Sequence, residues 1–223
     1  MTNVVYVRLV IILDIFDDNT GVDNNIGSES VFVEAGSASG TDTLWFSSQF
    51  PKGKIFAFEP LDVSYYRTVK RVGGCSNVEV HNVALGLKES NEELYVSSNR
   101  VSSSLLKPTG HIKFHPKIRF ENKTIVKTIN LDHFFRDKNI EEVDFMWLDM
   151  QGYEHTVLSH SPETLAKTKY LYTEVSLKEM YENSILYDEF KSWLKEKGFE
   201  VLHEFLYWED MGNVLFYNEN GGN

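Results

Sequence analysis

The chain has 223 residues, of which 42% are apolar and 13% are aromatic. A chain of this size can bury roughly 70% of its unfolded surface in one core, so we expect a single main domain. Its 33 acidic and 22 basic side chains give a net charge of −11, which argues against a nucleic-acid or anionic-membrane surface because such surfaces need clustered Lys and Arg. Cys75 is the only cysteine, so an intrachain disulfide and a paired-thiolate zinc site are excluded and a reducing, cytoplasmic location is expected.

The N-terminal region combines an apolar run with a polar stretch. The run Val4–Phe16 contains Arg8 and Asp14, lacks a basic leader and is too short to span a bilayer. We expect a strand or short helix at the domain edge or in a partner interface, with an interfacial membrane contact as the alternative. The segment Asp17–Ser30 is rich in Asp, Asn, Gly and Ser, which is typical of a loop. The expected organisation is an N-terminal extension over residues 1–30 and a main domain over residues 31–223.

From residue 31 onward, short apolar runs alternate with segments of helical period, as in βαβ units on a parallel sheet. The predicted strands are Val31–Val33, Lys54–Phe58, Val78–His81, Val143–Leu148, Lys169–Glu174, Glu200–Phe205 and Asn213–Tyr217. The predicted helices are Asp42–Phe50, Ser64–Val72, Leu131–Lys138, Tyr153–His160 and Tyr187–Lys197. The last two strands are separated only by Trp208–Gly212, which is too short for a helical crossover, so they should be antiparallel. The sequence therefore predicts a doubly wound, Rossmann-like α/β fold with a mostly parallel seven-stranded sheet and an antiparallel C-terminal hairpin.

One segment, Gly86–Lys127, breaks this alternation. It contains a predicted extra strand at Leu94–Ser97, a serine run at Ser102–Ser104 and a polar, basic loop before a further strand at Thr124–Thr128. Long segments of this kind inside a compact domain are usually functional or disordered.

The end of the first strand points to a nucleotide-like ligand. Residues 34–41 read Glu-Ala-Gly-Ser-Ala-Ser-Gly-Thr, a glycine-containing turn between a strand and a helix. A dinucleotide fingerprint would need glycine where Ala38 and Thr41 stand, and no Gly-Lys-Ser/Thr of a P-loop follows. In the remaining pattern, E-x-G-x-x-x-G, the carboxylate of Glu34 disfavours phosphate but suits a cation. S-adenosylmethionine carries a sulfonium and an ammonium group, and it therefore fits this motif; an ordinary tight turn is the alternative.

Two later strand ends extend the expected cofactor site. Glu59 ends the second strand 23 positions after Gly36, where a carboxylate can accept hydrogen bonds from both ribose hydroxyls. Asn82 and Ala84 follow the third strand and would lie against the adenine, although a buried turn asparagine is an open alternative. The expected cofactor-binding residues are Glu34, Gly36, Ser37, Gly40, Thr41, Glu59, Asn82 and Ala84.

Several blocks, in this order and spacing, resemble the FkbM family of class I methyltransferases over Val31–Tyr217. They are FVEAGSASGTDT, FAFEP, VEVHNVALG, SSSL, KTINLDHFF, DFMWLDMQGYEHTVL and YTEVS. The resemblance implies an S-adenosylmethionine-dependent enzyme that methylates mainly hydroxyl groups of sugars, polyketides and related metabolites. By position, Glu34, Gly36, Gly40 and Glu59 match the family's cofactor residues, and Asp149, Gly152 and Glu154 match its D-x-x-G-x-E block. The family's first motif more often begins with Asp, so Glu34 is a departure.

Methyl transfer to a hydroxyl needs a positioned base, or a metal that lowers the pKa of the hydroxyl. Asp149 and Glu174 end neighbouring predicted strands and are expected at the same mouth, as catalytic carboxylates or, alternatively, as Mg²⁺ ligands. A structural, helix-capping role is the alternative for Asp149. His155 is a further candidate base, whereas Glu154 is expected in the first helical turn.

The acceptor is expected to meet the segment before the fourth strand. Ser102, Ser103, Ser104 and Lys113 are the candidate substrate-binding residues. The basic side chains of this segment could bind an anionic acceptor such as a nucleotide sugar or an acidic glycan. These side chains are Lys107, Lys113, Lys117, Arg119, Lys123 and Lys127. The alternative is that the segment is an exposed, solvated loop without a binding role.

The sequence thus predicts an S-adenosylmethionine-dependent O-methyltransferase acting on a small-molecule or glycan hydroxyl. An N- or carboxyl-methyltransferase and a non-catalytic cofactor-binding partner domain remain open. A nicotinamide-dependent oxidoreductase is disfavoured by the glycine spacing. Neither the acceptor nor the oligomeric state follows from the sequence.

Overall fold

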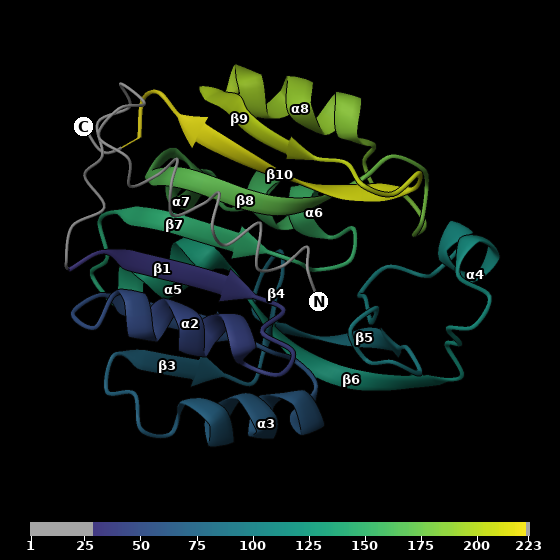
Figure 1. The fold of residues 1–223 in the computed structure, drawn as a ribbon, viewed down its shortest axis with the longest axis horizontal. Helices are drawn as coiled ribbons and strands as arrows, with labels where there is room; N and C mark the ends of the chain where they lie inside the picture. Colours follow the sequence, from purple (N-terminus) through teal and green to yellow (C-terminus); the bar gives the residue numbers. More distant parts are fainter. Residues whose placement is uncertain (1–28, 222–223) are drawn as a thin grey trace.

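The computed structural model describes residues 29–221. The expected N-terminal element at Val4–Phe16, and almost all of the loop after it, lie outside this range. Within it, seven strands form one sheet in the order β3-β2-β1-β7-β8-β10-β9 (Figure 1). The strands are β1 (Val31–Ala35), β2 (Lys54–Phe58), β3 (Val78–His81), β7 (Val143–Leu148), β8 (Thr168–Ser176), β9 (Phe199–Phe205) and β10 (Met211–Asn218).

The pairing of the strands confirms the predicted fold class. β1 is parallel to both β2 and β7, and β8 continues the parallel set beyond β7. β10 runs antiparallel to β8 and to β9, as the short connection predicted. The chain runs outward from β1 toward β3 and then returns to β7 on its other side. The neighbouring ends of β1 and β7 therefore form the switch point at which open α/β sheets bind ligands.

The helices cover the sheet from both faces. They are α2 (Thr41–Gln49), α3 (Asp62–Val72), α5 (Leu131–Asp137), α6 (Glu154–Ser159), α7 (Pro162–Ala166) and α8 (Tyr187–Glu196). The predicted helices agree with five of these to within two residues at each end. α7 was not predicted, because five residues give too little chain for an amphipathic period.

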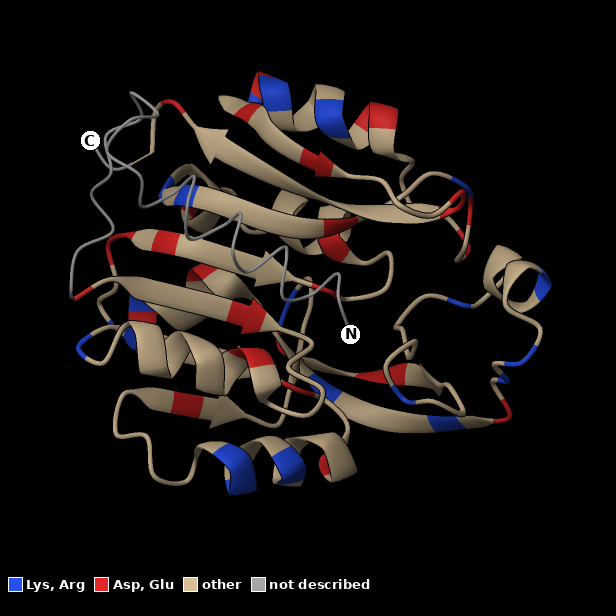
Figure 2. Cartoon of the chain, in the orientation of Figure 1, with Lys and Arg blue, Asp and Glu red and all other residues tan. Residues whose placement is uncertain are grey.

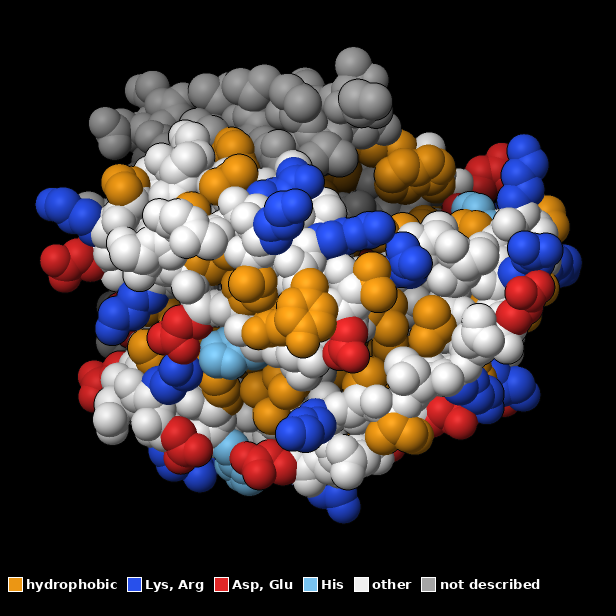
Figure 3. All heavy atoms as spheres, turned by 90° about the horizontal axis from the view of Figure 1, so that it is seen from below, with side chains coloured by type: hydrophobic (Ala, Val, Ile, Leu, Met, Phe, Trp, Pro, Cys, Tyr) orange, Lys and Arg blue, Asp and Glu red, His pale blue; other side chains and the backbone are white. Residues whose placement is uncertain are grey.

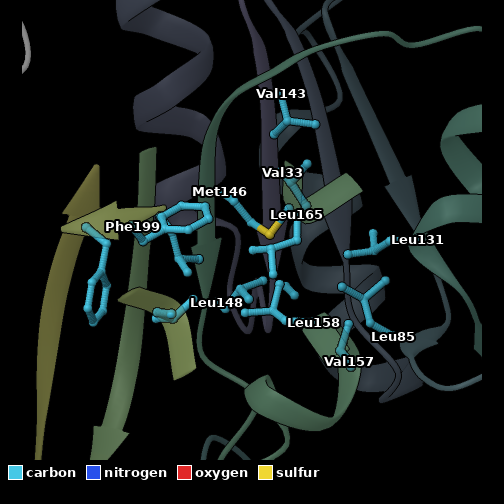
Figure 4. Packing of buried hydrophobic residues seen from close by; sticks show 14 of the residues in the cluster. Val33, Leu85, Leu131, Val143, Met146, Leu148, Val157, Leu158, Leu165 and Phe199 are labelled. Carbon is cyan, nitrogen blue, oxygen red and sulfur yellow. The ribbon is translucent and has the colours of Figure 1, made fainter. Parts of the chain in front are cut away.

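Alternate side chains of the strands feed two apolar layers. Val33, Met146 and Leu148 join Leu158 and Leu165 of the helices in the larger cluster (Figure 4). The opposite face of the sheet forms a second cluster, mostly aromatic, that includes a helical residue from α2. Its members include Phe32, Phe46, Phe145, Tyr170 and Tyr172. Successive side chains of β1 alternate between the two faces of the sheet. This alternation decides which of them lie at the carboxyl end of β1, where they can face a ligand.

An insertion between β3 and α5 forms a separate three-stranded sheet. Its strands are β4 (Ala84–Leu85), β5 (Ser90–Val96) and β6 (Asn122–Ile129), in the order β4-β6-β5. The two extra strands expected in this segment are confirmed and are longer than predicted. The short helix α4 (Gly110–Phe114) was missed because His111 is its only buried residue, which leaves no apolar period to detect. In Figure 1 the insertion lies at the side toward which the arrows of β1 and β7 point.

The surface is chemically mixed on the side that carries α3. Figure 3 shows hydrophobic, basic and acidic side chains interspersed there rather than gathered by kind. The exposed apolar residues Tyr66 and Val69 of α3 each precede a basic residue in its sequence, and the exposed Val63 follows an acidic one. No helix within residues 29–221 has both the length and the apolar character needed to cross a bilayer.

Candidate functional site

A cavity of about 370 Å³ lies at the carboxyl ends of β1, β2, β7 and β8, where the insertion and the β9–β10 connection also contribute. Its volume is in the range of small-molecule sites, about 300–1,000 Å³. Nine of the predicted site residues line it: Glu34, Gly36, Ser37, Glu59, Ala84, Ser103, Ser104, Asp149 and Glu174. The other six, Gly40, Thr41, Asn82, Ser102, Lys113 and His155, are not part of the lining.

The two motif glycines bring segments of the chain together. Gly36 has φ +87°, and a Cβ placed on it would lie 2.1 Å from the carbonyl oxygen of Asp149. Gly40 has φ +69°, and a Cβ there would lie 2.9 Å from the Cα of Thr68 in α3. The expectation that both glycines admit a ligand is therefore corrected for Gly40, which is needed for helix packing. Gly36 lines the cavity and also joins the ends of β1 and β7.

Glu59 is held by the backbone with room to accept further hydrogen bonds. One carboxylate oxygen accepts the amide of Ala38 at 2.9 Å and the other accepts the amide of Leu61 at 2.9 Å. Burial raises its pKa to about 7, against the lowering effect of these two amides. A carboxylate offers about four acceptor positions, so two remain. This geometry suits a pair of ribose hydroxyls.

Of the remaining predicted cofactor residues, some line the cavity and others support the structure around it. Glu34 is buried, lines the cavity and accepts a hydrogen bond from Thr43 Oγ1 at 2.5 Å. Thr41 faces away and accepts from Arg71 at 2.7 Å. The expected contact between Asn82 and adenine is corrected: the Asn82 amide donates to the carbonyls of Glu59, at 3.1 Å, and Pro60, at 3.3 Å. Asn82 thus positions the Glu59 turn.

An apolar wall completes this half of the cavity. Ala84 and Leu94 are buried in a small cluster with Leu61 and Leu105, and all four line the cavity. Leu94 and Leu105 belong to the insertion and were not predicted. A flat, apolar surface of this kind suits the face of a purine base.

The other half of the cavity contains two carboxylates joined by one amide; Glu174 is half-buried and Asp149 is exposed. Gln151 Nε2 donates to Asp149 at 2.7 Å and to Glu174 at 2.8 Å. The Gln151 oxygen accepts from the hydroxyl of Tyr181 at 2.9 Å. Ser104 Oγ donates to the Gln151 carbonyl at 2.9 Å, and Gln151 itself has φ +58°. We name Asp149, Gln151, Glu174 and Tyr181 the carboxylate cluster.

Desolvation within the cavity dominates the electrostatics of this cluster. It raises the pKa of Asp149, against the lowering effect of the hydrogen bond from Gln151. Burial and then the charges of Asp149 and Glu154 raise the pKa of Glu174 well above its ordinary value. Like charges near each other disfavour ionisation of both carboxylates at once.

Glu154 supports the turn beneath the cluster. As predicted, it lies in the first turn of a helix, α6. Its carboxylate accepts the amide of Met150 at 2.7 Å, and burial raises its pKa to about 8. Glu154 therefore stabilises the path of residues 149–154.

The expected roles of His155 and the basic loop are corrected. The His155 ring packs against Trp193 and Phe190 of α8, with ring centres 4.8 and 6.1 Å apart, and lies outside the cavity lining. Lys113 Nζ lies 5.6 Å from the Phe114 ring centre and is also outside the lining. The Ser102 hydroxyl accepts from the amide of Asn99 at 3.1 Å. Figure 2 shows the basic residues on the insertion and the acidic bands at the ends of β1 and β8.

Magnesium coordination by Asp149 and Glu174 finds no support in this geometry. Gln151 places an N–H donor between the two carboxylates, in the position that a cation would need. Over the part of the chain that the structure describes, no group of three or more His, Cys, Asp or Glu side chains is arranged to hold a metal ion.

The comparisons with known proteins agree with the fold and the motif blocks. The chain is 28% identical over 164 residues to the 2-O-methyltransferase NoeI of Sinorhizobium fredii, covering 70% of this chain and 68% of that protein. The structure of an FkbM methyltransferase from Methylobacillus flagellatus aligns over 90% of this chain with a TM-score of 0.54 and 12% identity; the chain spans 46% of that protein's length. Aeropyrum pernix fibrillarin, solved with bound S-adenosyl-L-methionine, has a TM-score of 0.51 and 13% identity, over 85% of this chain and 66% of that one.

The family model described as the methyltransferase FkbM domain matches residues 21–201. This range contains Glu59 and all four members of the carboxylate cluster. It covers most of the chain, and the protein therefore belongs to the FkbM methyltransferase family.

Proposed function

We propose that the protein is an S-adenosylmethionine-dependent O-methyltransferase whose acceptor is a hydroxyl of a sugar or related small molecule. The observation that carries this proposal is the pair Asp149 and Glu174, bridged by Gln151 and lining the same cavity as Glu59. The name of the relative NoeI, a 2-O-methyltransferase, supports transfer to oxygen.

The chain's own residues fit the cofactor in three ways. Glu59 has acceptor positions left for ribose hydroxyls, and the wall formed by Ala84, Leu94 and Leu105 suits adenine. The acidic lining, which includes Glu34 and Asp149, favours a sulfonium and an ammonium group by simple charge attraction. Bound S-adenosylmethionine supplies an electrophilic methyl group: an acceptor oxygen lone pair forms the C–O bond while the C–S bond breaks and leaves its electron pair on sulfur.

The carboxylate cluster accounts for the proton. The acceptor hydroxyl loses its proton to an ionised oxygen of Asp149 or Glu174, and that carboxyl later releases it to solvent. A raised pKa makes such a carboxylate a better base than an ordinary one near neutral pH. Gln151 fixes both carboxylates, and Tyr181 fixes Gln151, so the base is held in place before the acceptor arrives.

The test is transfer of a tritiated methyl group from S-adenosylmethionine to a panel of mono- and oligosaccharides. Glu174→Gln is expected to lower turnover by roughly a hundredfold, because it removes a candidate base while its amide oxygen can still accept from Gln151. Glu89→Gln, an exposed change on the insertion, should leave turnover unaltered. Label on nitrogen or on a carboxyl group would replace the proposal with an N- or carboxyl-methyltransferase. Cofactor binding with no transfer to any acceptor would favour the non-catalytic partner domain.

A further inference from the structure

We infer that the cavity mouth is a built subsite for a saccharide that carries an anionic substituent, with Arg100 binding the anion and the Tyr207–Trp208 pair stacking on the sugar ring. This inference rests on the proposed function and specifies its acceptor. It places recognition on two loops that face each other across one cavity: the β5–α4 segment and the β9–β10 connection.

The aromatic side of the subsite stands out by its exposure. Tyr207 is 53% exposed and Trp208 is 49% exposed, yet both line the cavity. The Tyr207 ring contacts the Phe205 ring, with ring centres 6.3 Å apart. The Trp208 ring packs on no other aromatic ring within residues 29–221. Exposed apolar area at the edge of a cavity marks a ligand surface. The flat C–H face of a sugar ring is the acceptor chemistry that an aromatic face with a polar edge suits.

The cationic side of the subsite is a single arginine. Among the lining residues that fall within 29–221, Arg100 is the only Lys or Arg. Its φ is +67°, and its turn is held by hydrogen bonds from its amide to the Ser97 carbonyl, at 3.0 Å, and from the Ser103 amide to its own carbonyl, at 3.2 Å. A non-glycine residue held in this conformation is a sign of function. In the described part of the chain, no hydrogen bond or ion pair engages its guanidinium.

The neighbouring basic residues do not share this position. Lys107 pairs with Glu182 at 3.8 Å, Arg119 pairs with Glu121 at 3.3 Å, and neither lines the cavity. Arg100 is thus the cation that an acceptor in the cavity can meet. A guanidinium binds phosphate, sulfate or carboxylate with two parallel hydrogen bonds, which fixes orientation as well as charge.

The charge pattern explains why the anion would bind at this rim. Five lining residues are acidic: Glu34, Asp42, Glu59, Asp149 and Glu174. They favour a cationic cofactor and repel an anionic acceptor group from the floor of the cavity. Arg100 offers the only opposite charge in the described part of the lining, so an acceptor with an anionic substituent is oriented with its uncharged hydroxyl toward the carboxylate cluster.

The inference is tested by calorimetric binding to the full chain, with and without S-adenosylhomocysteine. The probes are the 1-phosphates of glucose, galactose, mannose and fucose, each matched with its uncharged methyl glycoside. At least one phosphate should bind roughly tenfold more tightly than its methyl glycoside, and Arg100→Gln should abolish that difference. Trp208→Leu should weaken both members of the pair about fivefold. Two exposed residues outside the cavity give matched controls, Arg119→Gln and Tyr66→Leu, and neither should change binding.

Two further arms identify the source of the anion. A nucleoside diphosphate hexose and a hexose 6-sulfate of the preferred sugar are compared, and tighter binding of either one through Arg100 supports the inference. Failure of every charged hexose to bind, or an equal loss for charged and neutral probes in Arg100→Gln, would overturn it. If wild-type protein does not bind S-adenosylhomocysteine, the proposed function fails as well. Normal cofactor binding without discrimination by Arg100 overturns the inference alone.

Discussion

The two halves of the cavity hold their carboxylates by different means. In the cofactor half, Glu59 is fixed by two backbone amides, those of Ala38 and Leu61. In the acceptor half, Asp149 and Glu174 depend on the side-chain amide of Gln151, which in turn depends on Tyr181. Backbone support survives most substitutions, whereas side-chain support can be lost by one. The acceptor half is therefore the part of the site that single substitutions should disrupt selectively.

The largest effect is expected from Gln151→Met, which keeps the shape of the side chain but removes its donors. The carboxylates of Asp149 and Glu174 then lose their common partner, and turnover should fall roughly a hundredfold, equivalent to about 2.7 kcal/mol. The affinity for S-adenosylhomocysteine should stay within about threefold, because Glu59 keeps its amides. The measurement is methyl transfer together with calorimetry. Gln49→Met, at an exposed position on α2, is the control, and a variant Gln151→Met with near-normal turnover would contradict the assigned role.

A second substitution tests the close approach of the backbone at the ends of β1 and β7. Gly36→Ala places a Cβ against the Asp149 carbonyl in a left-handed conformation, and should lower the free energy of unfolding by at least about 2 kcal/mol. Gly74→Ala meets nothing within 4 Å and should change it by less than about 0.5 kcal/mol. Urea unfolding of both variants gives the comparison. Equal stabilities would show that the close approach of β1 and β7 is not constrained as described.

The pH dependence of cofactor binding tests whether the ionised form of Glu59 is the form that binds. Its pKa is raised to about 7 by burial, and the ionised form is the one that accepts two ribose hydroxyls. Affinity for S-adenosylhomocysteine should therefore increase roughly tenfold from about pH 6 to about pH 8. The sign for stability is the reverse: the folded protein holds this proton more tightly, so ionisation of Glu59 lowers stability as pH rises from about 4.5 through 7. In Glu59→Gln the affinity should be weaker, and this part of its pH dependence should disappear.

The smallest effect is expected from Tyr181→Phe. The change removes one hydroxyl whose proton is shared between the Gln151 oxygen and the Ser102 carbonyl, each at 2.9 Å, and should reduce turnover about fivefold, in line with about 1 kcal/mol for a hydrogen bond. Tyr66→Phe removes an exposed hydroxyl on α3 and serves as the control. A loss as large as that of Gln151→Met would contradict the view that Tyr181 acts only by holding Gln151.

The predictability of each half follows from the same difference. Glu34, Gly36 and Glu59 could be placed together at one cavity from the sequence, because a strand, a turn and a second strand end are local features with fixed spacing. Asp149 and Glu174 were found as strand ends, but the bridge between them was not. Its outer support, Tyr181, is 30 residues from Gln151 in sequence, and a glutamine inside a D-x-x-G-x-E block has no pattern that reveals its partners.

Three errors have equally physical causes. His155 lies on α6 next to a functional turn, but the phase of the helix turns its ring to Trp193. The basic residues of the insertion were treated as one anion-binding group. In the structure none of the predicted ones lines the cavity, and several form ion pairs with neighbouring carboxylates instead. Arg100 was not singled out, because only the three-dimensional path of its turn brings it to the lining.

The most direct test of the central claim, that this cavity binds the methyl donor through Glu59, is a calorimetric titration of S-adenosylhomocysteine at about pH 8, above the pKa of Glu59. Wild type, Glu59→Ala and the exposed control Glu89→Ala are compared. The account predicts one site per chain in wild type and control, and an affinity weakened by at least roughly thirtyfold in Glu59→Ala, as expected for loss of two charge-assisted hydrogen bonds. Equal affinity in all three proteins would contradict it and place the cofactor elsewhere.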